Sequence, residues 1–263
     1  MHLHFYKYQG AGNDFIILDG RAYIPTLSQK EINLLCNRRF GIGADGLMIL
    51  GSAPQVDFSM RYYNSNGKEG SMCGNGGRCL TACAVRLGIS PKMDLTRFTF
   101  SAIDGIHHAE TLEHDQICLE MKQVNQVQAY GKEGFFLDTG SPHLVLFDAD
   151  TDRIDVAKCG AFWRRHPDFA PEGTNVNFVA IDSDGSLFVR TFERGVEEET
   201  FACGTGVTAA AMAAYMRTKG SRTYHIRTLG GELQVSFKTR GTQFYDVRLT
   251  GPATFVFEGD IKI

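Results

Sequence analysis

Short stretches in which apolar and polar residues alternate recur along this chain of 263 residues. Phe58, Met60 and Tyr62 alternate with polar neighbours, which is the two-residue period of a half-buried strand. The run 47–50 is apolar throughout and predicts a buried strand. Further strands are predicted near the N-terminus and at 15–18, 98–103, 117–121, 176–181, 187–192, 231–237, 244–249 and 255–257.

Four segments have the features of helices. Ser28 and Glu31 have the spacing of a capping box, which starts a helix directly after Ser28. A second helix is predicted over 154–165, ending before a proline. Two more are predicted at about 74–87 and 205–218, each followed by a glycine that favours a helix end. Strands therefore outnumber helices, and each half of the chain has one strongly helical segment that begins at a glycine-rich motif.

These two glycine-flanked helices begin with the same motif, about half the chain apart. Cys73 precedes a Gly-x-Gly sequence, and so does Cys203. Each copy also follows an aromatic-containing strand and a polar turn, so whole units are repeated. We therefore expect an α/β (α+β) fold of two similar domains related by a pseudo-twofold axis. Each domain is expected to be a curved, mostly antiparallel sheet around a central helix, with the active site in the cleft between the domains.

The position of the two cysteines indicates their chemistry. Backbone amides at a helix start lack intrahelical partners and carry partial positive charge. A thiol held there ionises more easily, and glycines let an anionic group approach the amides. Two such elements in one chain suggest that Cys73 and Cys203 face one substrate from opposite sides. The alternative is that both are small buried hydrophobic residues of the core.

The remaining motifs are weaker. Cys79 and Cys83 lie one helical turn apart behind Cys73 and are predicted to be core residues, because no zinc-binding spacing occurs. The G-x-G-x-x-G sequence at 41–46 precedes a strand instead of a helix, so a tight turn is favoured over a nucleotide site. Arg194 has the chemistry to hold a carboxylate in a two-pronged contact, with a surface ion pair as the alternative.

Composition narrows the class of protein. Apolar residues make up 43% and charged residues 22%, as in a soluble protein with a core, and the length suits one large or two ordinary domains. A net charge of −3 gives no case for nucleic acid or an anionic membrane. No apolar run is long enough to span a membrane, and the first residues lack the pattern of a signal peptide. Seven cysteines suit reduced thiols in a cytosolic protein.

Seven short blocks occur in a specific order along the chain: GAGNDF at 10–15, GIGADG at 41–46, MCGNG at 72–76, SPH at 141–143, NVNF at 175–178, ERG at 193–195 and ACGTG at 202–206. Together they closely resemble the diaminopimelate epimerase family over nearly the whole chain. The resemblance implies an isomerase that interconverts LL- and meso-2,6-diaminopimelate without a cofactor or metal, for lysine and peptidoglycan-precursor synthesis. It also implies a cytoplasmic homodimer, with domains at 1–115 (completed by 250–263) and 116–249.

The resemblance also assigns roles to individual residues. Cys73 is the proton donor and Cys203 the proton acceptor for one direction, with the roles exchanged in reverse. The substrate-binding residues implied are Asn13, Asn64, Gly74, Asn75, Asn175, Glu193, Arg194, Gly204 and Thr205. His143 and Glu193 are implied to tune the thiols. Ser141 and Gly46 depart from the family, since many members have Asn at the first position and some have Gln at the second.

Two other functions remain open from the residues. One is another two-thiol isomerase, such as a proline racemase-like or hydroxyproline epimerase-like enzyme, although the blocks around both cysteines argue against it. The other is an amino-acid-binding or thiol-redox protein without isomerase activity. Exchange of the α-hydrogen of diaminopimelate with solvent deuterium discriminates the second function from an epimerase.

Overall fold

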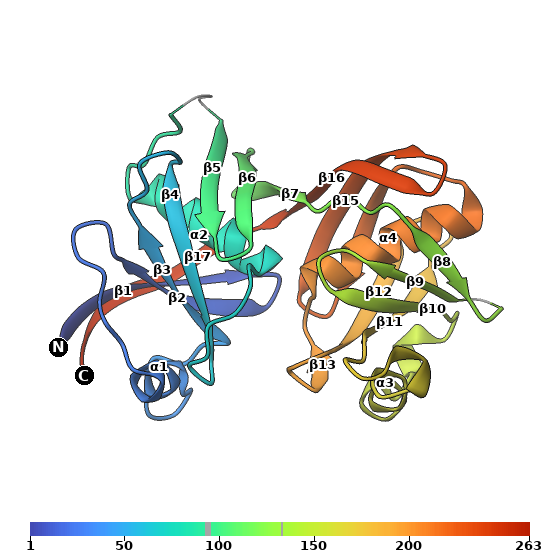
Figure 1. Cartoon of the computed structure of the whole chain (residues 1–263), viewed down its shortest axis with the longest axis horizontal. Coiled ribbons are helices and arrows are strands. Elements are labelled where there is room, and N and C mark those ends of the chain that lie inside the picture. The colour runs from blue at the N-terminus through green and yellow to red at the C-terminus, as the bar shows by residue number, and fades with distance from the viewer. Residues whose placement is uncertain (93–95, 133) are drawn as a thin grey trace. The chain divides into compact units, whose positions relative to one another are not determined.

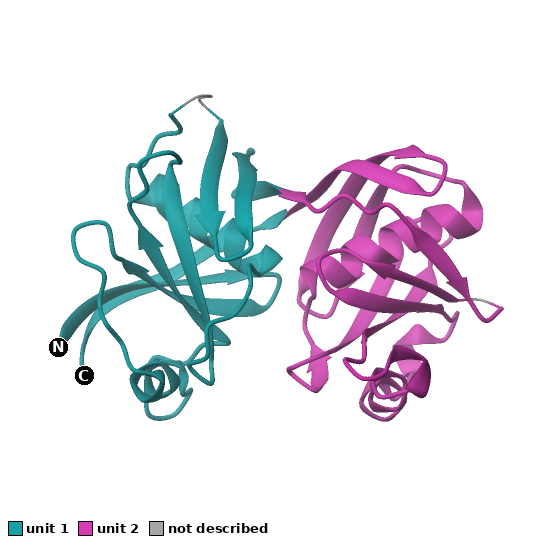
Figure 2. Ribbon diagram, viewed as in Figure 1, with its two compact units in different colours: residues 1–119, 251–263 teal, residues 120–250 magenta. Residues whose placement is uncertain are grey.

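The computed structural model describes residues 1–92, 96–132 and 134–263, which form two compact units (Figures 1 and 2). Unit 1 comprises residues 1–119 and 251–263, and unit 2 comprises residues 120–250. The chain passes from unit 1 to unit 2 within β7 (Gln116–Met121) and returns within β16 (Gln243–Pro252). The limits expected from the sequence placed these crossings at 115/116 and 249/250.

Unit 1 is built from one continuous series of paired strands. Its elements are β1 (His2–Gly10), β2 (Asn13–Asp19), α1 (Gln29–Cys36), β3 (Gly46–Gly51), β4 (Phe58–Asn64), α2 (Gly74–Arg86), β5 (Arg97–Ala102), β6 (Gly105–Thr111) and β17 (Thr254–Lys262). The strands pair in the order β17, β1, β2, β3, β4, β5, β6, β7. Only β2/β3 and β4/β5 are parallel among these pairs.

Unit 2 has the same kind of strand series. Its elements are β8 (Val127–Tyr130), β9 (Gly134–Asp138), β10 (Pro142–Phe147), η1 (Thr151–Arg153), α3 (Val156–Arg164), η2 (Pro167–Phe169), β11 (Asn175–Ile181), β12 (Leu187–Glu193), β13 (Glu198–Thr200), α4 (Gly204–Thr218), β14 (Thr223–Thr228) and β15 (Gly231–Arg240). The strands pair in the order β8, β9, β10, β11, β12, β14, β15, β16, and β13 also pairs with β12. Here β10/β11 and β12/β14 are parallel.

The parallel pairs show that the two units repeat one another. Apart from β17 in unit 1, and β8, the short strand β13 and the two 3-10 helices in unit 2, both units have the order of two strands, a helix, two strands, a long helix and three strands. The parallel pairs fall at the same two places, on either side of the antiparallel pair β3/β4 in unit 1 and β11/β12 in unit 2. The predicted α/β fold of two similar, mostly antiparallel domains is confirmed.

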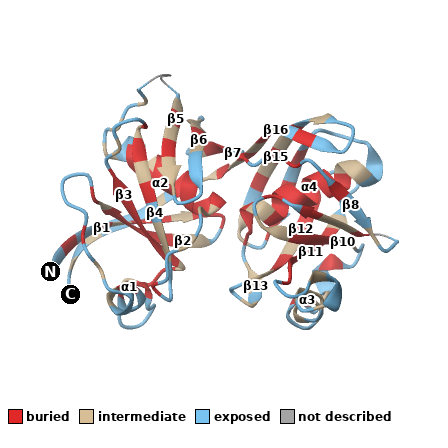
Figure 3. Ribbon diagram, in the orientation of Figure 1, coloured by how far each residue is buried: buried red, intermediate tan, exposed pale blue. Residues whose placement is uncertain are grey.

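The long helices α2 and α4 lie inside their units (Figure 3). Ten residues of each helix are buried, and each helix contacts strands on several sides. In α4 the stretch 209–214 is made of alanine and one methionine, all fully buried. A helix that is apolar on every side is stable only when it is enclosed. The sheet of each unit therefore surrounds a helix that begins at one of the two cysteines.

Helix α1 fixes the loop that leads into β3. Its predicted capping box is present, because Ser28 Oγ accepts the Glu31 N–H at 3.3 Å and the Ser28 N–H donates to Glu31 Oε2 at 2.7 Å. After the helix, the N–H groups of Gly43 and Ala44 donate to carbonyl groups of its last turn at 3.0 Å. Gly43 has φ +81°, a conformation that favours glycine. The loop therefore delivers residues 45 and 46 to a fixed place at the start of β3.

Candidate active site

Cys73 stands at the start of the central helix of unit 1. It is the N-cap residue of α2, with extended backbone angles of φ −101° and ψ 128°, and its own side chain makes no capping hydrogen bond. Its carbonyl accepts the first intrahelical bond, from Gly77 N–H at 2.7 Å. The preceding N–H groups of the first turn have no intrahelical acceptor and make this end electropositive. Cys73 is partly exposed, so its thiol lies at a surface where an anion can meet the helix start.

Asn13 connects Cys73 with the first turn of α2. Its Oδ1 lies 3.7 Å from Cys73 Sγ and accepts from Asn75 Nδ2 at 3.3 Å. Its Nδ2 donates to Asp45 Oδ2 at 2.7 Å. Because a carboxylate only accepts, this bond fixes which way the Asn13 amide points. The oxygen of Asn13 therefore faces the thiol, and three of the predicted site residues, Asn13, Cys73 and Asn75, form one network.

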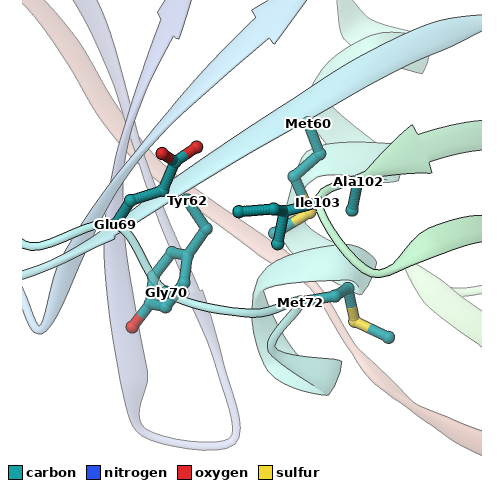
Figure 4. Close-up of a pocket in the computed structure, with 7 residues that line it drawn as sticks. All are labelled: Met60, Tyr62, Glu69, Gly70, Met72, Ala102 and Ile103. Atoms are coloured by element: carbon teal, nitrogen blue, oxygen red, sulfur yellow. The ribbon is translucent and has the colours of Figure 1, made fainter.

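Asn64 lies at the same edge of the sheet and is held by Tyr62. It pairs across β3/β4 with Gly46, and its Oδ1 accepts from Tyr62 Oη at 3.1 Å. The Tyr62 ring occupies the space beside Gly46, where a Cβ atom would fall 2.5 Å from ring atom Cε2, and Gly70 borders the ring as well. The ring also borders a pocket in unit 1 (Figure 4), lined by Met60, Tyr62, Glu69, Gly70, Met72, Ala102 and Ile103. Tyr62 was predicted only as a strand residue, so its place at the site is new.

Cys203 has the same place in unit 2. It is the N-cap residue of α4, with φ −115° and ψ 113°, and no side chain caps the helix. Its Sγ lies 3.4 Å from Thr205 Oγ1, and its side chain is largely buried. Thr205 is itself placed by Thr139, whose hydroxyl donates to the Thr205 carbonyl at 2.9 Å. Both predicted catalytic cysteines thus have the same backbone setting, with different polar neighbours.

His143 is completely buried behind this half of the site. Its Nδ1 lies 3.1 Å from Asn177 Nδ2, and Asn177 Oδ1 accepts from Thr191 Oγ1 at 3.0 Å. The amide nitrogen of Asn177 is a donor, so Nδ1 of His143 accepts and Nε2 carries the proton. Burial lowers the pKa of His143 to about 3, which keeps the ring neutral near pH 7. Asn177, which lies in the block at 175–178, was not assigned a role from the sequence.

Asn175, Ser141 and Arg194 form a second cluster in unit 2. Asn175 Nδ2 donates to Ser141 Oγ and to the Pro142 carbonyl, both at 2.8 Å, and its Oδ1 accepts the Arg194 N–H at 2.8 Å. Arg194 Nη2 lies 3.4 Å from the same Ser141 Oγ. Within the described residues Arg194 pairs with no carboxylate, so the alternative of a surface ion pair is not observed. Glu193 is partly buried beside this cluster at the end of β12.

The predicted residues occupy equivalent places in the two repeats. Phe15 pairs with Gly46 in the parallel pair β2/β3, and His143 pairs with Asn175 in the parallel pair β10/β11. This register makes Asn13 equivalent to Ser141 and Gly46 equivalent to Asn175. Likewise the ends of β4 and β12 make Asn64 equivalent to Glu193, and the helix starts relate Cys73 to Cys203. In each unit these residues lie where two strands begin, a third ends and the helix starts.

The other cysteines differ from Cys73 and Cys203. Burial raises the pKa of Cys36, Cys79 and Cys83 to about 12, so these thiols stay protonated in the core. The prediction that Cys79 and Cys83 are core residues is confirmed, because both are completely buried. Within the described residues no three His, Cys, Asp or Glu side chains come together as ligands for a metal ion.

A family model described as "Diaminopimelate epimerase" matches residues 5–127 and 135–256. The chain belongs to the diaminopimelate epimerase family. It is 47% identical to a diaminopimelate epimerase of Flavobacterium psychrophilum over 258 residues, which cover 97% of this chain and 99% of that protein. It is 39% identical to a diaminopimelate epimerase of Chlorobaculum tepidum over 260 residues, which cover 97% and 99% of the two chains. The chain is therefore an isomerase of this family, as the sequence blocks implied.

Solved structures of low sequence identity share the fold. A Bacillus anthracis protein of the phenazine biosynthesis PhzF family matches with a TM-score of 0.77 and 14% identity, and all of both chains is covered. A hydroxyproline epimerase of Agrobacterium vitis matches with a TM-score of 0.72 and 14% identity over 99% of this chain and 92% of that one. No helix in the described part of the chain is both long enough and apolar enough to cross a membrane.

Proposed function

We propose that this member of the family epimerises LL-2,6-diaminopimelate to meso-2,6-diaminopimelate without a cofactor, in lysine biosynthesis and the supply of peptidoglycan precursors. The observation that carries the proposal is the equivalent placement of Cys73 and Cys203, each as the N-cap residue of a repeated helix. An inversion at carbon needs one group to remove a proton from one face and another to deliver a proton to the opposite face. A repeat with a thiol in each copy supplies such a pair.

The reaction is a proton exchange in which the protein ends with the same number of protons. The thiolate of one cysteine takes the α-proton and becomes a thiol. The thiol of the other cysteine gives its proton to the opposite face of the resulting carbanion and becomes a thiolate. The negative charge that develops on the α-carboxylate is held by the amides at the two helix starts, at Gly74 and Asn75 and at Gly204 and Thr205.

The neighbours of the thiols support the role given to each cysteine. The Asn13 oxygen beside Cys73 only accepts, so it favours the protonated thiol that acts as donor. The Thr205 hydroxyl beside Cys203 also has a proton to donate, so it suits a thiolate that acts as acceptor. We therefore keep the assignment that the family resemblance implied, with Cys73 as the proton donor and Cys203 as the acceptor in one direction. The roles are exchanged in the reverse direction.

The remaining polar residues bind the substrate at its distal amino-acid end and tune the thiols. Asn13 and Asn64 act from unit 1, and Asn175, Glu193 and Arg194 act from unit 2. Arg194 suits this role because it has no carboxylate partner within the described residues and is oriented by Ser141. His143, as a buried neutral ring, and Glu193 set the protonation of the thiols. The enzyme is further proposed to be cytoplasmic and to form a homodimer. Sedimentation analysis of the purified protein checks the dimer.

Solvent exchange tests the proposed reaction directly. LL-diaminopimelate is incubated with the reduced protein in heavy water, and deuterium at the α-carbon is followed by mass spectrometry. We expect one deuterium per inverted centre, together with the appearance of the meso isomer. L-Proline and trans-4-hydroxy-L-proline serve as matched controls and are expected to remain unlabelled. Labelling of proline alone would assign the chain to a different two-thiol isomerase, and no labelling of any substrate would indicate a binding protein.

A further inference from the structure

Arg78, in the second turn of α2, is completely buried. Its Nη2 donates to Asn75 Oδ1 at 2.9 Å and its Nη1 lies 3.4 Å from the Gly74 carbonyl, while Nε has no hydrogen-bond partner within the described residues. No carboxylate forms an ion pair with Arg78 in the described part of the chain. A guanidinium stays charged in proteins, and an unpaired buried charge destabilises the folded state. Stability of the fold therefore does not explain why a charged residue occupies position 78.

The guanidinium is linked to Cys73 through two amide side chains. Because a guanidinium only donates, the oxygen of Asn75 must face Arg78, and the amide nitrogen of Asn75 must face Asn13. The Asn13 oxygen in turn lies 3.7 Å from Cys73 Sγ. Asp45 at one end and Arg78 at the other thus orient the two amide side chains in the same sense, and Arg78 adds a positive charge behind them.

The repeat in unit 2 shows that the fold does not require this charge. Counting from the two cysteines, the residue equivalent to Arg78 is Thr208. Its Oγ1 donates to the Gly204 carbonyl at 2.8 Å, as the guanidinium contacts the Gly74 carbonyl in unit 1. A neutral threonine therefore satisfies the same backbone group at the same point of the same helix. The positive charge is a property of the Cys73 half of the site alone.

Other charged groups near Asn13 offset one another. Asp14 pairs with Lys7 and Arg38, and Asp45 pairs with Arg38, at distances of 2.6 to 2.8 Å. Two carboxylates thus face two cations. The neighbour of Arg78 in the helix is Cys79, whose pKa is raised to about 12 by burial, so that it adds no negative charge. Of Lys7, Arg38 and Arg78, Arg78 is therefore the one without a carboxylate partner among the described residues.

We propose that Arg78 is a positioning residue of the epimerase reaction, which stabilises negative charge at Cys73 and fixes the amide of Asn75 for the substrate carboxylate. When Cys73 gives its proton to the carbanion, its sulfur becomes an anion that faces this buried charge. The same charge assists the helix start in holding the α-carboxylate. This role rests on the proposed function, because it assumes that Cys73 exchanges a proton during turnover.

The test measures the reactivity of the Cys73 thiol in the whole protein with Cys203→Ser, which leaves Cys73 as the one cysteine at the start of α2 or α4. Alkylation of Cys73 by iodoacetamide is followed by peptide mass spectrometry from pH 5 to 10, with Arg78 intact, with Arg78→Met and with Arg78→Lys. Methionine keeps most of the side-chain volume without the charge, and lysine keeps the charge without the planar set of guanidinium N–H donors. We expect Arg78→Met to raise the midpoint of the pH profile by about one unit and Arg78→Lys to leave it close to that of the parent.

Two further readouts separate this role from a structural one. Thermal unfolding of Arg78→Met is expected to show a fold at least as stable as the parent, because an unpaired buried charge has been removed. In the enzyme with both cysteines, Arg78→Met is expected to lower kcat/KM at least tenfold, whereas Arg78→Lys lowers it less. A folded methionine variant with an unchanged midpoint would overturn the proposal.

The outcome stays readable if the methionine variant does not fold. Arg78→Lys is then the deciding variant. An unchanged midpoint of its alkylation profile supports the role of the positive charge, and a raised KM supports the role of the guanidinium N–H donors. A lysine variant whose midpoint rises by a full unit would overturn it. Alkylation needs no turnover of diaminopimelate. Failure of the proposed function would appear in the solvent-exchange assay of the parent enzyme. Failure of this inference would appear in the alkylation profiles of the Arg78 variants, while the parent enzyme still exchanges the α-hydrogen.

Discussion

The aromatic ring of Tyr62 lies against Gly46, its diagonal neighbour across the antiparallel strands β3 and β4. A Cβ atom at position 46 would fall 2.5 Å from Tyr62 Cε2 and 2.8 Å from the Tyr63 carbonyl oxygen. The sequence marked Gly46 as a position from which no side chain reaches the substrate. The structure adds that a neighbouring phenol occupies the space and donates to Asn64, a proposed substrate contact.

Gly46→Ala is expected to destabilise the protein by about 1–3 kcal/mol, because the carbonyl oxygen of a paired strand cannot move aside as a side chain can. Urea unfolding of the variant and the parent measures the change. Gly51→Ala, at the other end of β3, is the matched control, since its nearest neighbour is the side chain of Ser59. Equal losses for the two variants would show that the Tyr62 and Tyr63 contacts do not distinguish position 46.

Gly206 and Gly76 provide a comparison between the repeats, since each lies three residues after its cysteine. A Cβ atom at Gly206 would overlap Asn177 Oδ1, whereas at Gly76 the neighbours are the flexible thioethers of Met48 and Met60. Gly206→Ala is expected to displace Asn177 and lower the free energy of unfolding by about 1–3 kcal/mol, more than Gly76→Ala. Chemical denaturation of both variants checks the order. A larger loss for Gly76→Ala contradicts it.

Substitution of either cysteine at a helix start is expected to abolish turnover. Cys73→Ala and Cys203→Ala each remove a proton-transfer group, so kcat is expected to fall by about 10²–10⁴-fold or more. Cys159→Ala is the matched control, because this partly exposed cysteine lies within α3 and not at the start of α2 or α4, and the variant is expected to keep full activity. Formation of the meso isomer, followed by chiral chromatography, measures all three. Full activity of Cys73→Ala or Cys203→Ala would contradict the mechanism.

Oxidation is expected to inactivate the enzyme reversibly by joining Cys73 to Cys203. This expectation follows from the proposed mechanism, in which both sulfur atoms approach one substrate carbon, because disulfides form by attack of a thiolate sulfur. Peptide mapping after mild oxidation checks for the linked peptides, and dithiothreitol is expected to restore activity. Cys159→Ser is expected to behave like the parent in this assay. Complete oxidation of both thiols without loss of activity would count against the pairing.

His143 is expected to make the folded state less stable as the pH falls. Its pKa is about 3 in the folded protein and about 6.5 in the unfolded chain, so below pH 6.5 the unfolded state binds a proton that the folded state does not. Its contribution therefore lowers the free energy of unfolding by roughly 1.4 kcal/mol for each unit between pH 6.5 and 3. Urea unfolding of the parent and of His143→Gln at pH 7 and pH 5 measures it. The variant is expected to lose less stability over this interval.

The repeat and the two long helices were predictable because their signals are local. A cysteine before Gly-x-Gly and a run of small residues mark a helix start wherever they occur, and both predicted helices agree with α2 and α4 to within one residue. Several strands were not predicted, among them β6, β8 and β14. In β10 the motif Ser141-Pro142-His143 was considered for its chemistry alone, although Pro142 is the first residue of a strand.

The residues that the sequence did not assign depend on packing between distant segments. Arg78 belongs to the first cysteine motif, but arginine is usually exposed, so its complete burial shows only in the fold. Asn177 lies on β11, and its hydrogen bond to His143 on β10 depends on the register of these two strands. Tyr62 reaches Gly46 only through the register of β3 against β4, whereas its contact with Asn64 lies within β4.

The pairing of β1 with β17 has a consequence for biosynthesis. These strands match from His2 with Lys262 to Gln9 with Thr254, so a strand made before unit 2 has its partner in a segment made after unit 2. Unit 2 is continuous in sequence and lies between them. During translation unit 2 can therefore complete its sheet while β1 still has an open edge. Cys73, the proposed proton donor, thus belongs to the unit whose sheet is completed only after unit 2 has been made.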